Sequence, residues 1–387
     1  MALPTDNEML APETWSRLNE HLSNRVFEVA KAQKNGTRVV GVFPGDWVPE
    51  ELIHACKAIP LGLILGGEPD PLDIAHTMLP RFICAFVRAA CGYRKTGERL
   101  QYTIPDLFVD PVSCQSMRRV GDVYSYYLNA DVIKLGVPHM PQRDDHVSHF
   151  KDNLDDLVAK LEKITGNKPE NLKGSIELYN RIRSALKTLS LMRKAPNPPI
   201  TTKEFICLNH ASLIGDPVFM AETLETLVQD LKDKEGKGTG PRLMIIGPCI
   251  AQGDWKVIDL VAELGARIMI EEVAEGMRYY WRDIKTEGNL MDNLAEGYLR
   301  DRNPWPFVVD VTQERSDRIF ETAKEFGAQG IIWYQLKYCE CYDFESHYNA
   351  EQSEKRGIPF IKLSSEYEQI DRGTVRTRIE AFLETIS

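Results

Sequence analysis

Cysteine is the residue type in this sequence that is best suited to redox or metal chemistry. Eight cysteines occur in 387 residues, too few per residue for a small disulfide-linked scaffold but many for a chain with reduced thiols. Thiols that do not simply pack in a core usually bind metals or take part in redox reactions. Three have a distinctive context: Cys84 in LPRFICAFVRA, Cys114 in DPVSCQSMRR and Cys339 in WYQLKYCECYDFE.

Spacing alone does not identify a metal site for these three cysteines. Their separations of 30 and 225 residues match neither the compact ferredoxin run nor a zinc-finger pattern. However, Cys114 and Cys339 directly follow predicted strands, where open parallel sheets bind their ligands. If the three loops converge, their thiolates suit an iron–sulfur cluster with one iron open to an outside ligand. Packing in the core is the alternative role for these cysteines.

The remaining cysteines are weaker candidates for this site. Cys341 competes with Cys339, because Cys-x-Cys spacing occurs both in metal sites and by coincidence. Cys249, in GPCIAQGD, lies between a predicted strand and a predicted helix, where a lowered thiol pKa is plausible, but packing is its expected role. Three others are expected in the core: Cys56, Cys91 and Cys207.

Two adjacent carboxylates, Glu50 and Glu51 in WVPEELIHA, begin a predicted helix. Negative charge at a helix N-terminus interacts favourably with the helix dipole, and this explains the presence of at least one of the two carboxylates. The functional alternative is that one faces a cleft and transfers protons beside a thioester-bound substrate, with its pKa tuned by burial. His54 is expected to be structural. Aromatic residues near the same loops suit either a wall around a planar acyl group or the core: Trp47, Trp333, Tyr334 and Tyr338.

Short apolar runs that alternate with helical patterns indicate the scaffold that must position these residues. Strands are predicted at residues 38–42, 59–65, 106–112 and 131–137, and again at 242–247, 266–272, 330–336 and 359–363. Apolar positions at helical spacing dominate 151–235. We therefore predict an α/β fold with two doubly wound parallel-sheet domains, residues 1–150 and 241–387, a helical layer and linker at 151–240, and an active site in the interdomain cleft.

Composition and missing motifs exclude several classes of protein. The net charge of -10 with dispersed basic residues argues against nucleic-acid binding. No apolar run approaches the roughly 20 residues of a membrane span, and no signal-peptide order is present, so a cytoplasmic location is expected. Because GxxxxGK[ST] and GxGxxG motifs are absent from the sequence, any ATP-driven step is expected on another polypeptide.

Ordered motifs along the chain resemble the benzoyl-CoA reductase/2-hydroxyacyl-CoA dehydratase family, and within it the small iron–sulfur subunit. They are PEELIHA, RFICAFVRA, PVSCQSMRR, WYQLKYCECYDFES, GIPFIKLSSEYE and TRIEAFLE. The resemblance implies a [4Fe-4S] or fused larger cluster on Cys84, Cys114 and Cys339, and an active-site carboxylate at Glu51. It also implies a homologous larger subunit, a separate ATP-hydrolysing iron–sulfur activator and an acyl-CoA substrate. Cys341 has no counterpart in the family pattern, which leaves the third ligand open between Cys339 and Cys341.

The form of SCQSMRR and WYQLKYCECYDFES favours the benzoyl-CoA reductase branch. That resemblance implies transfer of low-potential electrons from the activator to an aromatic acyl-CoA and reduction to a cyclic diene. The alternatives inside the family are the beta subunit of a 2-hydroxyacyl-CoA dehydratase, which expels a hydroxyl group through a ketyl radical, and a stand-alone homodimeric cluster protein. Outside it stand a non-enzymatic two-domain solute-binding module and a zinc-stabilised scaffold with four closed ligands.

Overall fold

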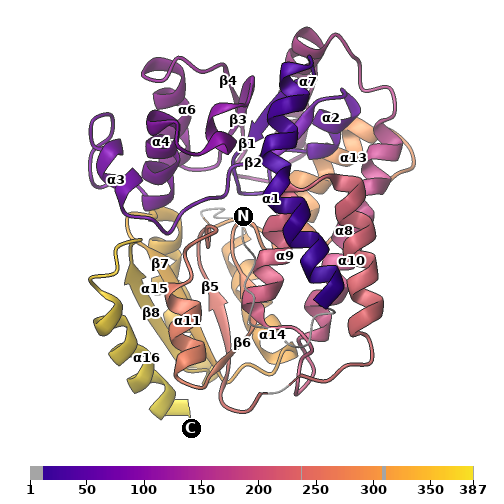
Figure 1. Ribbon diagram of the computed structural model, residues 1–387. Helices are drawn as coiled ribbons and strands as arrows, with labels where there is room; N and C mark the ends of the chain where they lie inside the picture. The colour runs from indigo at the N-terminus through magenta and orange to yellow at the C-terminus, as the bar shows by residue number, and fades with distance from the viewer. Residues whose placement is uncertain (1–11, 237, 307–310, 387) are drawn as a thin grey trace.

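The computed structural model describes residues 12–236, 238–306 and 311–386. Two four-stranded parallel sheets surrounded by helices give the predicted α/β fold (Figure 1). The first sheet has the order β2-β1-β3-β4 and the second has the order β6-β5-β7-β8. Each predicted run contains or overlaps one strand: β1 (Val39–Val42), β2 (Ile59–Gly62), β3 (Leu107–Val112), β4 (Val132–Gly136), β5 (Arg242–Ile246), β6 (Arg267–Glu272), β7 (Gly330–Leu336) and β8 (Phe360–Ser365).

The central strands are buried because helices cover their sheets. β1 is buried at all four positions and β7 at all seven, as expected for parallel strands that read as continuous apolar runs. In the first half, the helices are α2 (Glu50–Ala55), α3 (Asp70–Ala75), α4 (Ala85–Thr96), α5 (Leu100–Thr103) and α6 (Gln115–Tyr126). In the second half, they are α11 (Lys256–Glu263), α12 (Met277–Tyr280), α14 (Thr312–Glu325), α15 (Glu340–Arg356) and α16 (Arg372–Ile386). Two further elements of this part of the chain, α13 (Leu290–Glu296) and the π-helix η1 (Gly297–Asp301), pack against α7 (Asp144–Thr165) on the side of the first sheet.

Five further helices lie beside the two sheets. They are α1 (Pro12–Lys34), α7 (Asp144–Thr165), α8 (Leu172–Met192), α9 (Thr202–Ile214) and α10 (Pro217–Leu231) (Figure 1). α9 begins with a capping box between Thr201 and Glu204, which satisfies free backbone N–H groups of its first turn. It contacts β2 of the first sheet and β6 of the second. A Cβ atom on Gly62 of β2 would lie 2.8 Å from the Leu213 carbonyl oxygen, so glycine there permits this close packing.

The two halves also meet through their backbones, close to the carboxyl ends of their strands. Leu65 forms a parallel β-bridge with Gln252, and the Gln252 N–H donates to the Ile64 carbonyl at 2.8 Å. The segments that follow β2 and β5 therefore lie side by side, and the loops that end both sheets face a common region. None of the described helices is both long and apolar enough to cross a membrane.

Candidate active site

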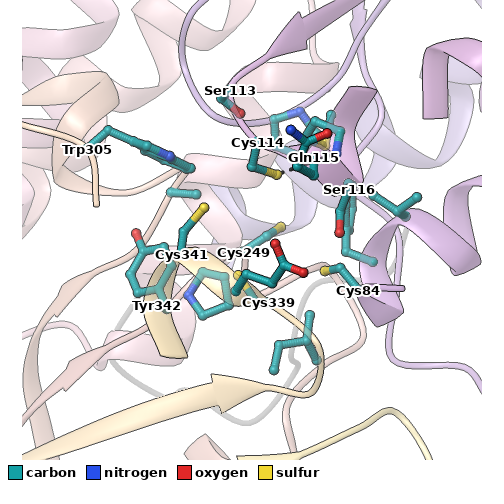
Figure 2. A pocket seen from close by; sticks show the side chains of 18 residues that line it. Cys84, Ser113, Cys114, Gln115, Ser116, Cys249, Trp305, Cys339, Cys341 and Tyr342 are labelled. Atoms are coloured by element: carbon teal, nitrogen blue, oxygen red, sulfur yellow. Dashed lines mark hydrogen bonds between the residues drawn. The ribbon is translucent and has the colours of Figure 1, made fainter. Parts of the chain in front are cut away.

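A cavity of about 60 Å³ lies among loops that follow strands of both sheets (Figure 2). Pro44 follows β1, Cys114 follows β3, Cys249 follows β5 and Cys339 follows β7, and all four line the cavity. In the first sheet β2 and β3 lie on opposite sides of β1, and in the second sheet β6 and β7 lie on opposite sides of β5. The loops after β1, β3, β5 and β7 therefore lie at the switch points where α/β sheets bind ligands. Apolar side chains form much of the wall: Phe86, Val87, Met117, Ala274, Trp305, Leu336 and Tyr342.

The structure brings the three predicted cysteines together at this cavity. Each is the N-cap residue of a helix: Cys84 of α4, Cys114 of α6 and Cys339 of α15. The Met117 backbone N–H donates to the Cys114 sulfur at 3.4 Å. Because a helix N-terminus carries partial positive charge, three converging N-termini favour thiolates and an anionic group between them.

Four thiols form two pairs at this cavity, and Figure 2 shows their sulfur atoms. Cys339 lies beside Cys84, and interaction between the two thiols lowers the pKa of Cys84 against the effect of burial. Interaction with Cys341 likewise lowers the pKa of Cys114. The same interactions, together with burial, raise the pKa of Cys339 and Cys341. Each half therefore contributes two thiols to these pairs, and Cys341 lies at the site beside Cys339.

The donor set fits a cluster better than a single metal ion. Among the described residues, no three His, Cys, Asp or Glu side chains are grouped so that they could hold a metal ion, for which metal–sulfur distances of about 2.3 Å are typical. A cluster is larger than an ion, so its ligating thiols stand further apart. Cysteine thiolates are the usual ligands of iron–sulfur clusters, and helix N-termini favour negative charge beside them, so the thiols at this cavity are compatible with such a cluster.

The other residues considered from the sequence divide between the cavity and the core. Cys249 lines the cavity, and burial together with the nearby Glu275 carboxylate raises its pKa. Trp305 and Tyr342 contribute rings to the wall, although no motif in the sequence singles them out. Four aromatic residues predicted near this site do not line the cavity: Trp47, Trp333, Tyr334 and Tyr338. Three cysteines predicted in the core are buried away from it: Cys56, Cys91 and Cys207.

Glu51 lies outside the cavity lining, in a fully buried ion pair. Its Oε1 accepts from Arg183 Nη2 at 2.6 Å, and its Oε2 accepts from the Tyr298 hydroxyl at 2.6 Å. Both charged side chains are 0% exposed. Burial opposes ionisation, but Arg183 and Tyr298 together outweigh it and hold the pKa of Glu51 below its ordinary value. Arg183 is 132 residues away in sequence, which is why no local pattern predicts the pair.

Glu50 has a different environment from its neighbour. It lines a second cavity of about 20 Å³ together with Asp46 and Tyr279, and Pro44 lies in the wall of both cavities. The Tyr279 hydroxyl donates to Glu50 Oε2 at 3.3 Å. Burial, followed by repulsion from Glu51 and Asp46, raises the pKa of Glu50 to about 8. Glu50 is therefore mostly protonated near neutral pH and can act as a proton donor.

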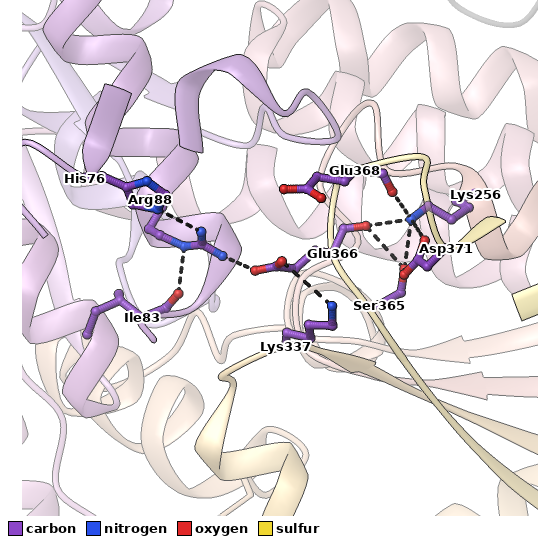
Figure 3. A network of polar contacts seen from close by, with 9 residues as sticks. All are labelled: His76, Ile83, Arg88, Lys256, Lys337, Ser365, Glu366, Glu368 and Asp371. Atoms are coloured by element: carbon purple, nitrogen blue, oxygen red, sulfur yellow. Dashed lines mark hydrogen bonds and ion pairs between the residues drawn. The ribbon is translucent and has the colours of Figure 1, made fainter. Parts of the chain in front are cut away.

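A polar network joins the two cysteine-bearing segments on either side of the cavity (Figure 3). Arg88, on the first turns of α4 after Cys84, forms an ion pair with Glu366, and its Nε donates to the Ile83 carbonyl at 2.9 Å. Glu366 also approaches Lys337 Nζ at 3.9 Å, two residues before Cys339. The buried Lys256 Nζ holds the same loop by donating to the Glu366 carbonyl at 2.7 Å.

Substitution of Glu366 is expected to loosen this connection. Glu366→Gln should lower the free energy of unfolding by about 3 kcal/mol, because Arg88 is left buried without its counter-charge. The measurement is denaturant unfolding. Glu380→Gln is the matched control, since Glu380 pairs with Arg376 at 3.2 Å where both side chains are more than 40% exposed, and such pairs contribute about 0–1 kcal/mol. Equal effects of the two substitutions would contradict the prediction.

Comparison with known proteins identifies the family. The model of the 2-hydroxyglutaryl-CoA dehydratase D-component family matches residues 47–386. The (R)-phenyllactyl-CoA dehydratase beta subunit of Clostridium sporogenes is 26% identical, with 92% of this chain and 93% of the relative covered. A subunit of the benzoyl-CoA reductase of Thauera aromatica is 21% identical, with 90% and 91% covered. The beta subunit of the (R)-2-hydroxyglutaryl-CoA dehydratase of Acidaminococcus fermentans is 22% identical, with 92% and 95% covered.

These matches extend over the cysteine-bearing loops of both sheets as well as the helices between them. The family resemblance predicted from the motifs is thereby confirmed. The chain belongs to the 2-hydroxyglutaryl-CoA dehydratase D-component family and is an enzyme subunit related to those of benzoyl-CoA reductases and 2-hydroxyacyl-CoA dehydratases.

Proposed function

We propose that this chain is the iron–sulfur subunit of an enzyme that passes low-potential electrons to an acyl-CoA thioester. The observation that carries the proposal is the convergence of Cys84, Cys114 and Cys339, each at a helix N-terminus, on one cavity between the two halves. These thiols would hold a [4Fe-4S] or larger cluster in the interdomain cleft. Such a cluster, when bound, supplies single electrons at low potential.

The residues of the chain itself create the conditions that this chemistry needs. Phe86, Trp305 and Tyr342 give the cavity an apolar wall, and a water-poor site strengthens electrostatic interactions and limits loss of reducing equivalents to side reactions. The converging helix N-termini stabilise negative charge that accumulates near them on reduction. The scaffold therefore binds, orients and shields, while the cofactor supplies the electron.

We assign proton delivery to the pair of adjacent glutamates. The family resemblance gives Glu51 the position of the active-site carboxylate, but its ion pair with Arg183 keeps it charged and internally bound. Glu50 is the better donor, because its raised pKa keeps a proton on it. Its cavity also shares Pro44 with the cavity lined by Cys84, Cys114 and Cys339. In this proposal Glu51 anchors helix α2 through Arg183, and Glu50 supplies the proton to the reduced substrate.

Two reactions on the thioester are candidates. The cysteine motifs favour dearomatising reduction of benzoyl-CoA, with electrons from an ATP-hydrolysing activator and with a homologous larger subunit as partner. Radical dehydration of a 2-hydroxyacyl-CoA is the second candidate, since the dehydratase subunit from Clostridium sporogenes is 26% identical and the reductase subunit is 21% identical. The proposed architecture serves both reactions, because each needs an electron and a dry cavity.

The test is an anaerobic preparation of this chain with its copurifying partner. We expect iron and acid-labile sulfide in the native complex and loss of this subunit's share in Cys84→Ser, Cys114→Ser and Cys339→Ser, with Cys56→Ala as the control because Cys56 does not line the cavity. Turnover with activator and ATP should then yield either a cyclic diene from benzoyl-CoA or an enoyl-CoA from a 2-hydroxyacyl-CoA. A native complex without iron would reject the proposal in favour of a solute-binding module.

A further inference from the structure

Two cysteines beyond the three of the family pattern, Cys341 and Cys249, line the cavity that holds Cys84, Cys114 and Cys339. Cys341 is the second residue of α15, and only Glu340 separates it from the N-cap Cys339. Both cysteines line the cavity, and Cys341 is 5% exposed. Figure 2 shows its side chain entering the region where Cys84 and Cys114 also end. Cys341 is therefore part of the site and is not a remote core residue.

The pairing of the thiols argues that Cys341 completes a set of four. Cys339 contacts Cys84, while Cys341 contacts Cys114, so the two cysteines of the second half approach different cysteines of the first half. A redundant third ligand would compete with Cys339 for the same partner. Here the two instead occupy separate positions around one cavity, as four ligands of a closed coordination shell do.

Cys249 shows what a cavity cysteine without such a role looks like. It also lines the cavity and is 6% exposed. However, burial and the nearby Glu275 carboxylate raise the pKa of its thiol, and Glu275 Oε1 accepts from the Ile250 N–H at 3.0 Å. The neighbour of Cys249 is thus a carboxylate, whereas the neighbour of Cys341 is Cys114, another thiol of the set.

We infer that Cys341 is the fourth thiolate ligand of the cluster in this subunit. This inference rests on the proposed function and makes it more specific. On binding, the Cys341 S–H bond breaks, its proton leaves to solvent, and a sulfur–iron bond forms where an outside ligand would otherwise stand. A cluster closed by four protein sulfurs transfers electrons but offers no iron to a substrate. The cluster would then relay electrons to the substrate without coordinating it.

The experiment compares the copurified complex with its Cys341→Ala, Cys339→Ala and Cys249→Ala variants under anaerobic conditions. Iron content and the electron paramagnetic resonance spectrum of the reduced protein are recorded with and without added cyanide. We expect Cys341→Ala to keep at least half of the subunit's iron on the remaining three thiols and to gain a cyanide-dependent spectral shift absent from the native protein. Cys249→Ala should match the native protein in both measurements.

The outcomes separate the inference from the proposed function. Cys341→Ala with native iron, native spectrum and native cyanide response would overturn the fourth-ligand role while leaving the proposed function intact. Complete loss of iron from Cys341→Ala, with the circular dichroism spectrum and unfolding midpoint of the iron-free protein unchanged, would support a ligand role. If those properties of the iron-free variant changed as well, the loss would count against the inference. Iron-free native protein would reject the proposed function itself.

Discussion

Replacing Glu51 by glutamine is expected to lower the free energy of unfolding by about 3–5 kcal/mol, because removal of one partner leaves a buried charge uncompensated. Arg183 would keep its hydrogen bonds to Asn180, at 2.8 and 3.3 Å, and could still donate to the glutamine oxygen, but no side chain of opposite charge would be in contact with it. Its Nη1 atom already lacks a hydrogen-bond partner. The loss should appear as a large fall in the denaturant midpoint of unfolding, with an unchanged dependence on denaturant concentration.

Glu50→Gln is the matched control for this substitution. It lies one residue away on the same helix, is equally buried and involves the same change of side chain. Because Glu50 is mostly protonated near neutral pH, glutamine replaces a neutral group of similar shape in the folded state and removes the cost of keeping a proton on Glu50, so this variant should not lose stability at pH 7. Equal losses from the two variants would show that burial alone, and not the Arg183 ion pair, sets the energetic importance of Glu51.

Glu50→Gln should have its large effect on turnover. If Glu50 delivers the proton, we expect kcat to fall by about 10²–10⁴-fold, the usual contribution of a positioned general acid, while iron content stays native. In the native enzyme kcat should also fall as pH rises through about 8, because the pKa of Glu50 is raised to about 8 and the donor is lost above it. Native turnover in Glu50→Gln would exclude this residue, and a pH-independent loss would point to a role in positioning.

The raised pKa of Glu50 also predicts that the free energy of unfolding depends on pH. The ordinary pKa of a glutamate is 4.5 and burial raises that of Glu50 to about 8, so between these values the folded protein binds more protons than the unfolded chain. Stability must therefore fall as pH rises through this window, with a slope of up to about 1.4 kcal/mol per pH unit from this group. Urea unfolding of the native protein and of Glu50→Gln at several pH values should show a smaller slope in the variant.

The sheets could be predicted from the sequence because buried parallel strands leave a strong local signal. Runs such as residues 330–336 are apolar, short and bounded by loops, and each became a strand. Cys114 and Cys339 could be placed at the ends of strands for the same reason. The switch-point rule then directs both to the carboxyl edges of their sheets, where the structure has them.

The arrangement between the two halves has no such local signal. Cys84 follows a loop and not a strand, and its approach to Cys339 depends on how α4 packs against the turn after β7. Adjacent helical residues point about 100° apart, so the motif PEELIHA does not reveal that Glu51 turns toward Arg183 and Glu50 toward a cavity. Cys341 shows the same limit, since Cys-x-Cys spacing does not tell which of the two thiols faces Cys114.

Helix α9 has a mechanical consequence for the whole molecule. All of its residues except Lys203 are buried, and it contacts both β2 and β6. A hinge motion that separates the two halves would remove α9 from one of the sheets. The free-energy cost would be about 2.5 kcal/mol for each 100 Å² of apolar surface exposed. Hinged closure, on which many two-lobed receptors depend, is thus opposed here. In the proposed function, such a frame would hold the cysteine-bearing loops of the two halves at fixed positions around their common cavity.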